Sequence, residues 1–188
     1  MFCLLFDVKP NKGHLENYLH EVDKLNPILE TYSGLKWIDR FSLLGDSEAL
    51  LSLQIWDSEE AILAWREDPH HLLAQAKGKK EHFQDYRIRV GLDYSEKIKN
   101  VNISFKNKTK PSESKYFIIV NSFKEFTSSP FIPYKSINRD NAYVSIASTL
   151  GIESAIKLCP KNRSQSGIIS SSVYKVIRDY NMHGRRKL

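Results

Sequence analysis

The chain has 188 residues, of which 41% are hydrophobic and 27% are charged, and its formal net charge is +6. This composition supports a packed core, and the length allows one domain or two small ones. No run of 18 apolar residues occurs, so we expect no membrane span and no membrane partner. Only two cysteines are present, Cys3 and Cys159, without metal-ligand spacing. They predict a reduced, cytoplasmic protein with no metal site.

The positive charge gathers in short clusters at 77–80, 106–110 and 185–187. Such clusters can serve an anionic partner. No aromatic residues are interleaved with them, and they match no nucleic-acid-binding motif. We therefore expect a solvated basic surface and no nucleic-acid partner.

The first 45 residues predict a strand, a helix and a second strand. Residues 2–8 form an apolar run that Asp7 interrupts, and no basic segment precedes it, which indicates a first strand and not a signal peptide. Apolar residues then recur at helical spacing from Leu15 to Leu25, and Pro27 is expected to kink or end that helix. Residues 35–44 alternate again, and Gly45-Asp46 is a hairpin signal.

Residues 49–90 fix the fold most clearly. They predict a strand at 49–56, a helix capped by Asp57 and carrying Ala61, Ile62 and Trp65 on one face, and a second helix from Pro69 to His82. An alternating strand then closes the segment at 86–90. The order β-α-β-β-α-α-β predicts a ferredoxin-like α+β sandwich, an antiparallel sheet with helices on one face. The other face is also apolar, so a second copy of the same sheet is expected to cover it.

Residues 26–90 carry a family resemblance. The matching parts are Gly34-Leu35 with Arg40-Phe41, the block LLSLQIWDSEEAILAWR, and the series His71, Ala74-Gln75 and Tyr86-Arg87-Ile88-Arg89-Val90. This order and spacing resemble the antibiotic biosynthesis monooxygenase family of dimeric α+β barrel proteins. The resemblance covers about half of the chain. It implies the fold more strongly than the activity, because family members include quinone-forming oxygenases, haem-degrading enzymes and proteins of unknown role.

The second half predicts a degenerate repeat of the first. Residues 1–94 are expected to form the first domain, 95–115 a linker rich in Lys, Ser and Asn, and 116–188 the second ferredoxin-like unit. The segment SVYKVIRDY at 172–180 parallels DYRIRVGLDY at 85–94. A counterpart of the long first helix is missing, since Ser128–Pro133 is a poor helix former. Either the two halves pack into one intrachain barrel and the protein is a monomer, or the first domain forms a homodimer and the second is appended.

The resemblance also suggests a chemistry and its residues. Family enzymes that oxidise aromatic compounds need no metal or flavin, because the deprotonated substrate itself supplies electrons to dioxygen. We therefore expect no cofactor, and a small aromatic or quinone-type molecule with dioxygen as partners. The candidate catalytic residues are His71 as a base near neutral pH, Trp65 and Tyr86, and the candidate substrate-binding residues are Arg40 and Asp7.

Each candidate also has a structural interpretation. Trp65 and Tyr86 fit core positions, His71 could be a surface or capping histidine, and Arg40 and Asp7 could form an ion pair across neighbouring strands. Haem degradation is disfavoured, because the positions of the haem-degrading branch are occupied by Gln75 and Asp7, and Gln is a poor iron ligand. The leading function is a cofactor-independent monooxygenase-like protein. The alternative is a non-catalytic ligand-binding or stress-related module.

Overall fold

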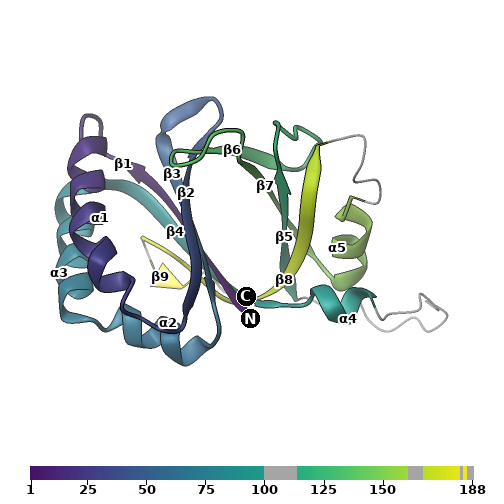
Figure 1. Ribbon diagram of the computed structural model, residues 1–188, viewed down its shortest axis with the longest axis horizontal. Helices are drawn as coiled ribbons and strands as arrows, with labels where there is room; N and C mark the ends of the chain where they lie inside the picture. The colour runs from purple at the N-terminus through teal and green to yellow at the C-terminus, as the bar shows by residue number, and fades with distance from the viewer. Residues whose placement is uncertain (100–113, 161–166, 183, 186–188) are drawn as a thin grey trace.

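A closed β-barrel forms the centre of the molecule (Figure 1). The computed structural model describes residues 1–99, 114–160, 167–182 and 184–185. Within these residues, eight antiparallel strands follow one another around the barrel in the order β4-β1-β3-β2-β6-β7-β5-β8, and pairing of β4 with β8 closes it. The strands are β1 (Phe2–Pro10), β2 (Leu35–Leu43), β3 (Asp46–Trp56), β4 (Phe83–Asp93), β5 (Lys115–Ser122), β6 (Ile132–Ser136), β7 (Tyr143–Leu150) and β8 (Ile168–Asn181), and the short β9 (Gly184–Arg185) pairs with the end of β8.

The barrel consists of two ferredoxin-like halves within one chain. Strands β4-β1-β3-β2 make the first half and β8-β5-β7-β6 repeat the same order in the second, so β1 corresponds to β5, β2 to β6, β3 to β7 and β4 to β8. The halves join through β2–β6 and β4–β8. The predicted α+β fold with a degenerate tandem copy is therefore confirmed, and the barrel closes within the chain. With the inward-facing residues Leu5 and Ile119 as equivalents, the alignment of 172–180 with 85–94 needs a shift, because Arg89 pairs with Leu5 and Ser172 pairs with Ile119.

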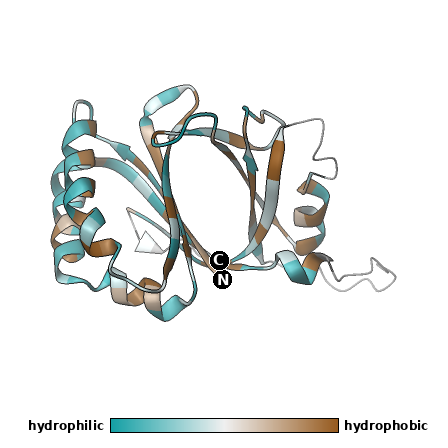
Figure 2. Cartoon of the chain, in the orientation of Figure 1, coloured by the Kyte–Doolittle hydropathy of each residue, from teal (hydrophilic) through white to brown (hydrophobic). Residues whose placement is uncertain are grey.

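Helices cover the two halves unequally (Figure 1). The first half carries α1 (Leu15–Leu29), α2 (Glu59–Arg66) and α3 (Pro69–Lys77), which continues into a π-helical turn, η1 (Gly78–His82). The second half carries α5 (Ile152–Leu158), and no helix lies between β5 and β6, as predicted. Figure 2 shows that the helices alternate between hydrophilic and hydrophobic colours, as expected of amphipathic helices on a sheet. None of the described helices is long and apolar enough to cross a membrane.

Of two predicted details of the helices, one alternative for Pro27, a helix end, does not occur, and the predicted cap of α2 is wrong. Pro27 lies inside α1 and does not end it, because the helix loses one backbone hydrogen bond at the proline while Leu29, only 3% exposed, still packs in the core. The cap of α2 is Ser58 and not Asp57. The Ser58 backbone is extended and its hydroxyl accepts a hydrogen bond from the Ala61 N–H at 3.1 Å. Asp57 instead pairs with Lys36 at 3.0 Å.

Strand alternation divides the core into an inner and an outer layer. Cys3 and Leu5 of β1 point into the barrel, whereas Phe2 and Leu4 pack against the helices. Gly91 of β4 is required by the inner packing, since a Cβ there would lie 2.6 Å from the Phe117 ring. The outer layer is the surface on which the candidate site is built.

The predicted linker begins with a helix, α4 (Ser95–Lys99), whose Ser95 hydroxyl accepts a hydrogen bond from the Val173 N–H of β8 at 3.1 Å. The rest of that segment to residue 113, the basic cluster at 106–110 and residues 186–187 lie outside the described residues. The domain boundaries remain a prediction.

Candidate active site

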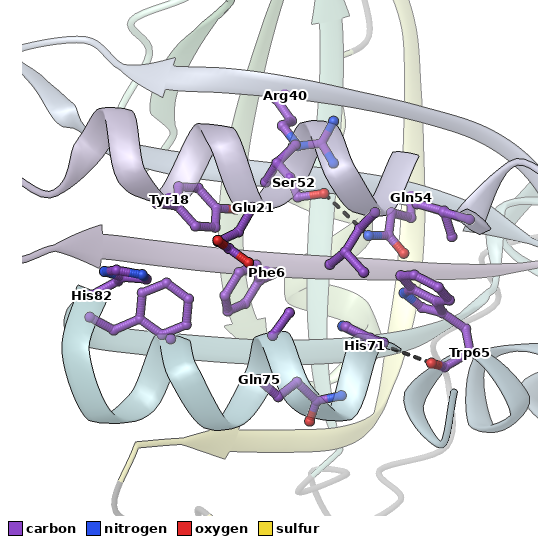
Figure 3. Close-up of a pocket in the computed structure, with 16 residues that line it drawn as sticks. Phe6, Tyr18, Glu21, Arg40, Ser52, Gln54, Trp65, His71, Gln75 and His82 are labelled. Atoms are coloured by element: carbon purple, nitrogen blue, oxygen red, sulfur yellow. Dashed lines mark hydrogen bonds between the residues drawn. The ribbon is translucent and has the colours of Figure 1, made fainter. Parts of the chain in front are cut away.

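Two adjoining cavities lie between the helices of the first half and the outer face of its sheet. The larger has a volume of about 250 Å³ and the smaller about 100 Å³. The smaller one is drawn in Figure 3. Six residues line both: Phe6, Gln54, Trp65, His71, Gln75 and Phe83. The lining is mostly apolar with a few polar groups, which is typical of small-molecule sites.

Trp65 and His71 form the wall shared by the two cavities. Their rings stack with centroids 4.2 Å apart and an interplanar angle of 14°. Trp65 is 4% exposed and belongs to the core cluster between helices and sheet, so it is both a core residue and a cavity residue. The core and pocket interpretations of Trp65 therefore both apply.

Asp68 holds His71 in this position. It caps α3 by accepting hydrogen bonds from the backbone N–H groups of His70 at 2.8 Å and His71 at 3.1 Å. Its other oxygen accepts a hydrogen bond from the Tyr32 hydroxyl at 2.8 Å. The Tyr32 ring meets Trp65 edge-on, with centroids 5.3 Å apart. The cap of α3 and the stacked ring pair are thus tied to one carboxylate.

The protonation of His71 follows from its surroundings. Its Nδ1 lies 2.8 Å from the Trp65 carbonyl oxygen (Figure 3). A carbonyl oxygen only accepts, so Nδ1 carries the proton and Nε2 of the neutral ring has a free lone pair. Burial lowers the pKa of His71, against smaller opposing effects of the Trp65 carbonyl and Asp68. At neutral pH the side chain is therefore a neutral base at the cavity wall.

Tyr86 of β4 lines the larger cavity together with Trp65 and His71. Its ring packs against Phe83 and Phe6, each with centroids 6.0 Å apart. The structure thus brings together the three residues predicted to be catalytic.

Arg40 of β2 lines the smaller cavity. Its guanidinium donates to Asn26 Oδ1 at 3.1 Å, while its Nε is buried and has no hydrogen-bond partner among the described residues. Arg40 adjoins the Tyr18 hydroxyl, whose pKa is raised by burial and lowered, to a lesser extent, by the Arg40 charge. A cation therefore lies in the wall of the smaller cavity.

Asp7 lies on the opposite side of the sheet, inside the barrel. Its carboxylate pairs with Arg89 at 2.7 Å and accepts a hydrogen bond from the Tyr134 hydroxyl at 3.2 Å. The ion pair expected between Asp7 and Arg40 does not form, because β3 separates their strands and the two side chains point to opposite faces. Asp7 does not share the cavities of the other four candidates.

Several lining residues were not among the predicted site residues. Gln54 accepts a hydrogen bond from Trp56 Nε1 at 3.0 Å and donates one to Ser52 at 3.2 Å. A glutamine inside the apolar run of β3 was the available signal. The second half also contributes to the larger cavity through Arg178, Tyr180 and Gly184, because β8 runs beside β4. Only strand pairing across the chain reveals that contribution.

Comparison with known proteins finds sequence relatives over part of the chain. Residues 1–77 match the family model described as antibiotic biosynthesis monooxygenase. A curated relative from Pyricularia oryzae, described as jasmonate monooxygenase ABM, is 32% identical over 91 residues, which are 48% of this chain and 42% of that protein. The chain thus spans less than half of the length of this relative.

Residues 1–77 are thus similar to an antibiotic biosynthesis monooxygenase domain. The family expectation is confirmed for this segment. Among solved structures, an antibiotic biosynthesis monooxygenase-type protein of Nitrosomonas europaea is 10% identical, covers 48% of this chain and 95% of its own, and has a TM-score of 0.44. An anthrone oxidase-like protein is 12% identical, covers 96% of this chain and 93% of its own, and has a TM-score of 0.40. These low values add nothing to what the strand order shows by itself.

Proposed function

We propose that the protein is a cofactor-independent monooxygenase whose substrate, a small aromatic compound of the phenol or quinol type, binds in the two cavities beside His71. The main support is the neutral His71 ring, fixed through Nδ1 on the Trp65 carbonyl at the wall of an apolar cavity of about 250 Å³. A histidine exposed to solvent beside a closed core would have supported a non-catalytic module instead.

In the proposed reaction, His71 Nε2 removes the phenolic proton. The imidazolium formed is stabilised by its Nδ1–H bond to the Trp65 carbonyl and by stacking on the indole ring at 4.2 Å. The Arg40 guanidinium favours the anionic substrate through its charge, and Tyr86 lines the larger cavity.

The electron-rich anion then reacts with dioxygen. One oxygen atom becomes a carbonyl on the ring carbon that loses its hydrogen, the other leaves as water, and the substrate supplies all four electrons. The sum is a phenol plus dioxygen giving a quinone plus water, so no external reductant is consumed.

The test measures oxygen uptake and quinone absorbance with a panel of phenols, naphthols and quinols and no added cofactor. One quinone is expected per dioxygen consumed. His71→Ala should lower the rate by at least about 100-fold, the usual contribution of a positioned general base. His70→Ala is the matched control, because His70 is the neighbouring imidazole with an exposed side chain, and it should retain the rate.

Two results count against the proposal. A wild-type rate in His71→Ala would remove the proposed base. Saturable binding of phenols without oxygen uptake would assign the protein to the non-catalytic alternative.

A further inference from the structure

The interior of the barrel differs between positions that the two halves share. We treat Leu5 of β1 and Ile119 of β5 as equivalent, because both belong to the core inside the barrel. Their partners Leu53 and Ile146 also lie at the same distance before the first residues of α2 and α5, and the strand registers then give the other corresponding residues. Arg89 is the β4 residue opposite Leu5, and Ser172 is the β8 residue opposite Ile119. One step along, Arg87 opposite Asp7 corresponds to Ser170 opposite Asn121. Two arginines and an aspartate of the first half are thus two serines and an asparagine in the second.

In the first half, the long side chain of Arg89 fills the barrel interior together with Asp7. The Arg89 guanidinium pairs with Asp7 at 2.7 Å, donates to the Ser148 hydroxyl at 3.1 Å, and lies 5.8 Å from the centroid of the Phe117 ring. Arg89 as a residue is 6% exposed. A buried, paired arginine therefore occupies the inside of the barrel on this side.

In the second half, the short side chains of Ser172 and Asn121 leave the equivalent part of the barrel interior empty. A cavity of about 240 Å³ lies there, lined by Trp37, Leu53, Ile55, Ile119, Asn121, Ser172 and Tyr174. An eight-stranded barrel has an interior that side chains can just fill or that can hold one small ligand. A dry cavity of about 150 Å³ is already enough for benzene.

We propose that this barrel cavity is a second ligand site, separate from the cavities beside His71, and that it binds a neutral one- or two-ring aromatic molecule with a hydroxyl or carbonyl group. The walls supply an indole ring and aliphatic side chains for a flat apolar body. The polar groups are the Asn121 amide, the Ser172 hydroxyl and the Tyr174 hydroxyl. All of these are neutral, and burial raises the pKa of Tyr174, so the lining favours an uncharged ligand.

Trp37 is held in place by a neighbouring ion pair. Arg139 lies 5.3 Å from the centroid of the Trp37 indole ring and donates two hydrogen bonds to Asp39, at 2.7 and 2.9 Å. Asp39 is 4% exposed and also accepts from the Ser136 hydroxyl at 2.9 Å. This network fixes the aromatic wall before any ligand arrives, which lowers the entropic cost of binding.

The experiment uses 4-bromophenol as the probe, because bromine both quenches tryptophan fluorescence and gives an anomalous diffraction signal. Trp37 lines the barrel cavity and Trp65 lines the cavities beside His71, whereas Trp56, the third tryptophan, lines neither and is kept in all variants. In the Trp65→Phe variant, the probe should still quench Trp37 fluorescence in a saturable manner, and we call this component of the quenching the Trp37 phase. In the Trp37→Phe variant the Trp37 phase should be lost. Crystals soaked with the probe should show a bromine peak between Trp37 and Tyr174.

The decisive variant places the residues of the first half at the equivalent positions of the second half. Ser172→Arg combined with Asn121→Asp recreates the pair that fills the opposite side, and it should weaken the Trp37 phase by at least about tenfold, because the volume is then occupied. If that variant unfolds in a thermal melt, Ser172→Leu fills the same space without charge.

The proposal is overturned if Trp65→Phe shows no saturable quenching, if a folded filling variant binds as tightly as the wild type, or if the peak appears only at crystal concentration without a solution signal. This experiment measures binding and not phenol oxidation. The second site can therefore be disproved while the proposed function stands, and the proposed function can be disproved while the second site stands.

Discussion

The two halves of the barrel have the same strand order but are hollow in opposite places. Outside the sheet, the first half leaves cavities beside Trp65 and His71, whereas in the second half Ala155 of α5 is fully buried against a cluster that includes Tyr116, Ile118 and Val120. Inside the barrel the relation is reversed, because Arg89 and Asp7 fill the place that Ser172 and Asn121 leave open. One scaffold thus provides two different sites. The covering helices decide where the outer cavities lie, and the volumes of the side chains inside the barrel decide where the inner cavity lies.

The largest effect is expected from the residue that belongs to both core and cavity. Trp65→Ala should lower the free energy of unfolding by about 3–5 kcal/mol, since it removes a large aromatic side chain that is 4% exposed. Urea denaturation measures this loss, and Trp65→Phe should lose much less. A loss below about 1 kcal/mol for the alanine variant would mean that the indole faces open space and is not core.

A smaller effect on stability should distinguish the packed outer face of the second half from the outer face of the first half, which contains the cavities. Ala155→Leu inserts bulk into the packed second half and should cost about 1–3 kcal/mol. Ala74→Leu inserts the same atoms into the wall of the small cavity in the first half, where space exists, and should cost clearly less. Equal losses in denaturation experiments would contradict the proposed difference between the two outer faces.

The smallest effect concerns pH and belongs to the first half alone. Burial lowers the pKa of His71 in the folded protein below its ordinary value of 6.5, so just below pH 6.5 the unfolded chain binds more protons. Stability from this group is fully present above pH 6.5 and is lost as the pH falls towards the folded pKa. The rate should fall in the same direction, because protonation occupies Nε2.

Unfolding free energies measured between about pH 5 and pH 7 test this sign. His71→Gln should flatten the dependence, whereas the exposed His70→Gln should keep it. A variant of His71 with an unchanged slope would show that its titration is the same in the folded and unfolded chains.

Much of the architecture could be read from local patterns. The alternation of Cys3 and Leu5 with Phe2 and Leu4 predicts a strand buried on both faces, and the helical spacing around Trp65 predicts the helix that covers it. The helix cap was misplaced by one residue, because Asp57 and Ser58 both suit a cap and only the backbone angles select Ser58. The grouping of Trp65, His71 and Tyr86 followed from the family resemblance as well as from spacing.

The sequence by itself indicated most strands, most helix positions and the tandem copy, since these depend on hydrophobic period and on motifs close together in the chain. Only the tertiary structure decided that Asp7 faces the barrel interior with Arg89, that β8 supplies Arg178 and Tyr180 to the first half's cavity, and that a second cavity lies beside Trp37. Each of these depends on which strands pair across the closed barrel. That pairing joins residues far apart in the sequence, where no local pattern records which side chains will meet.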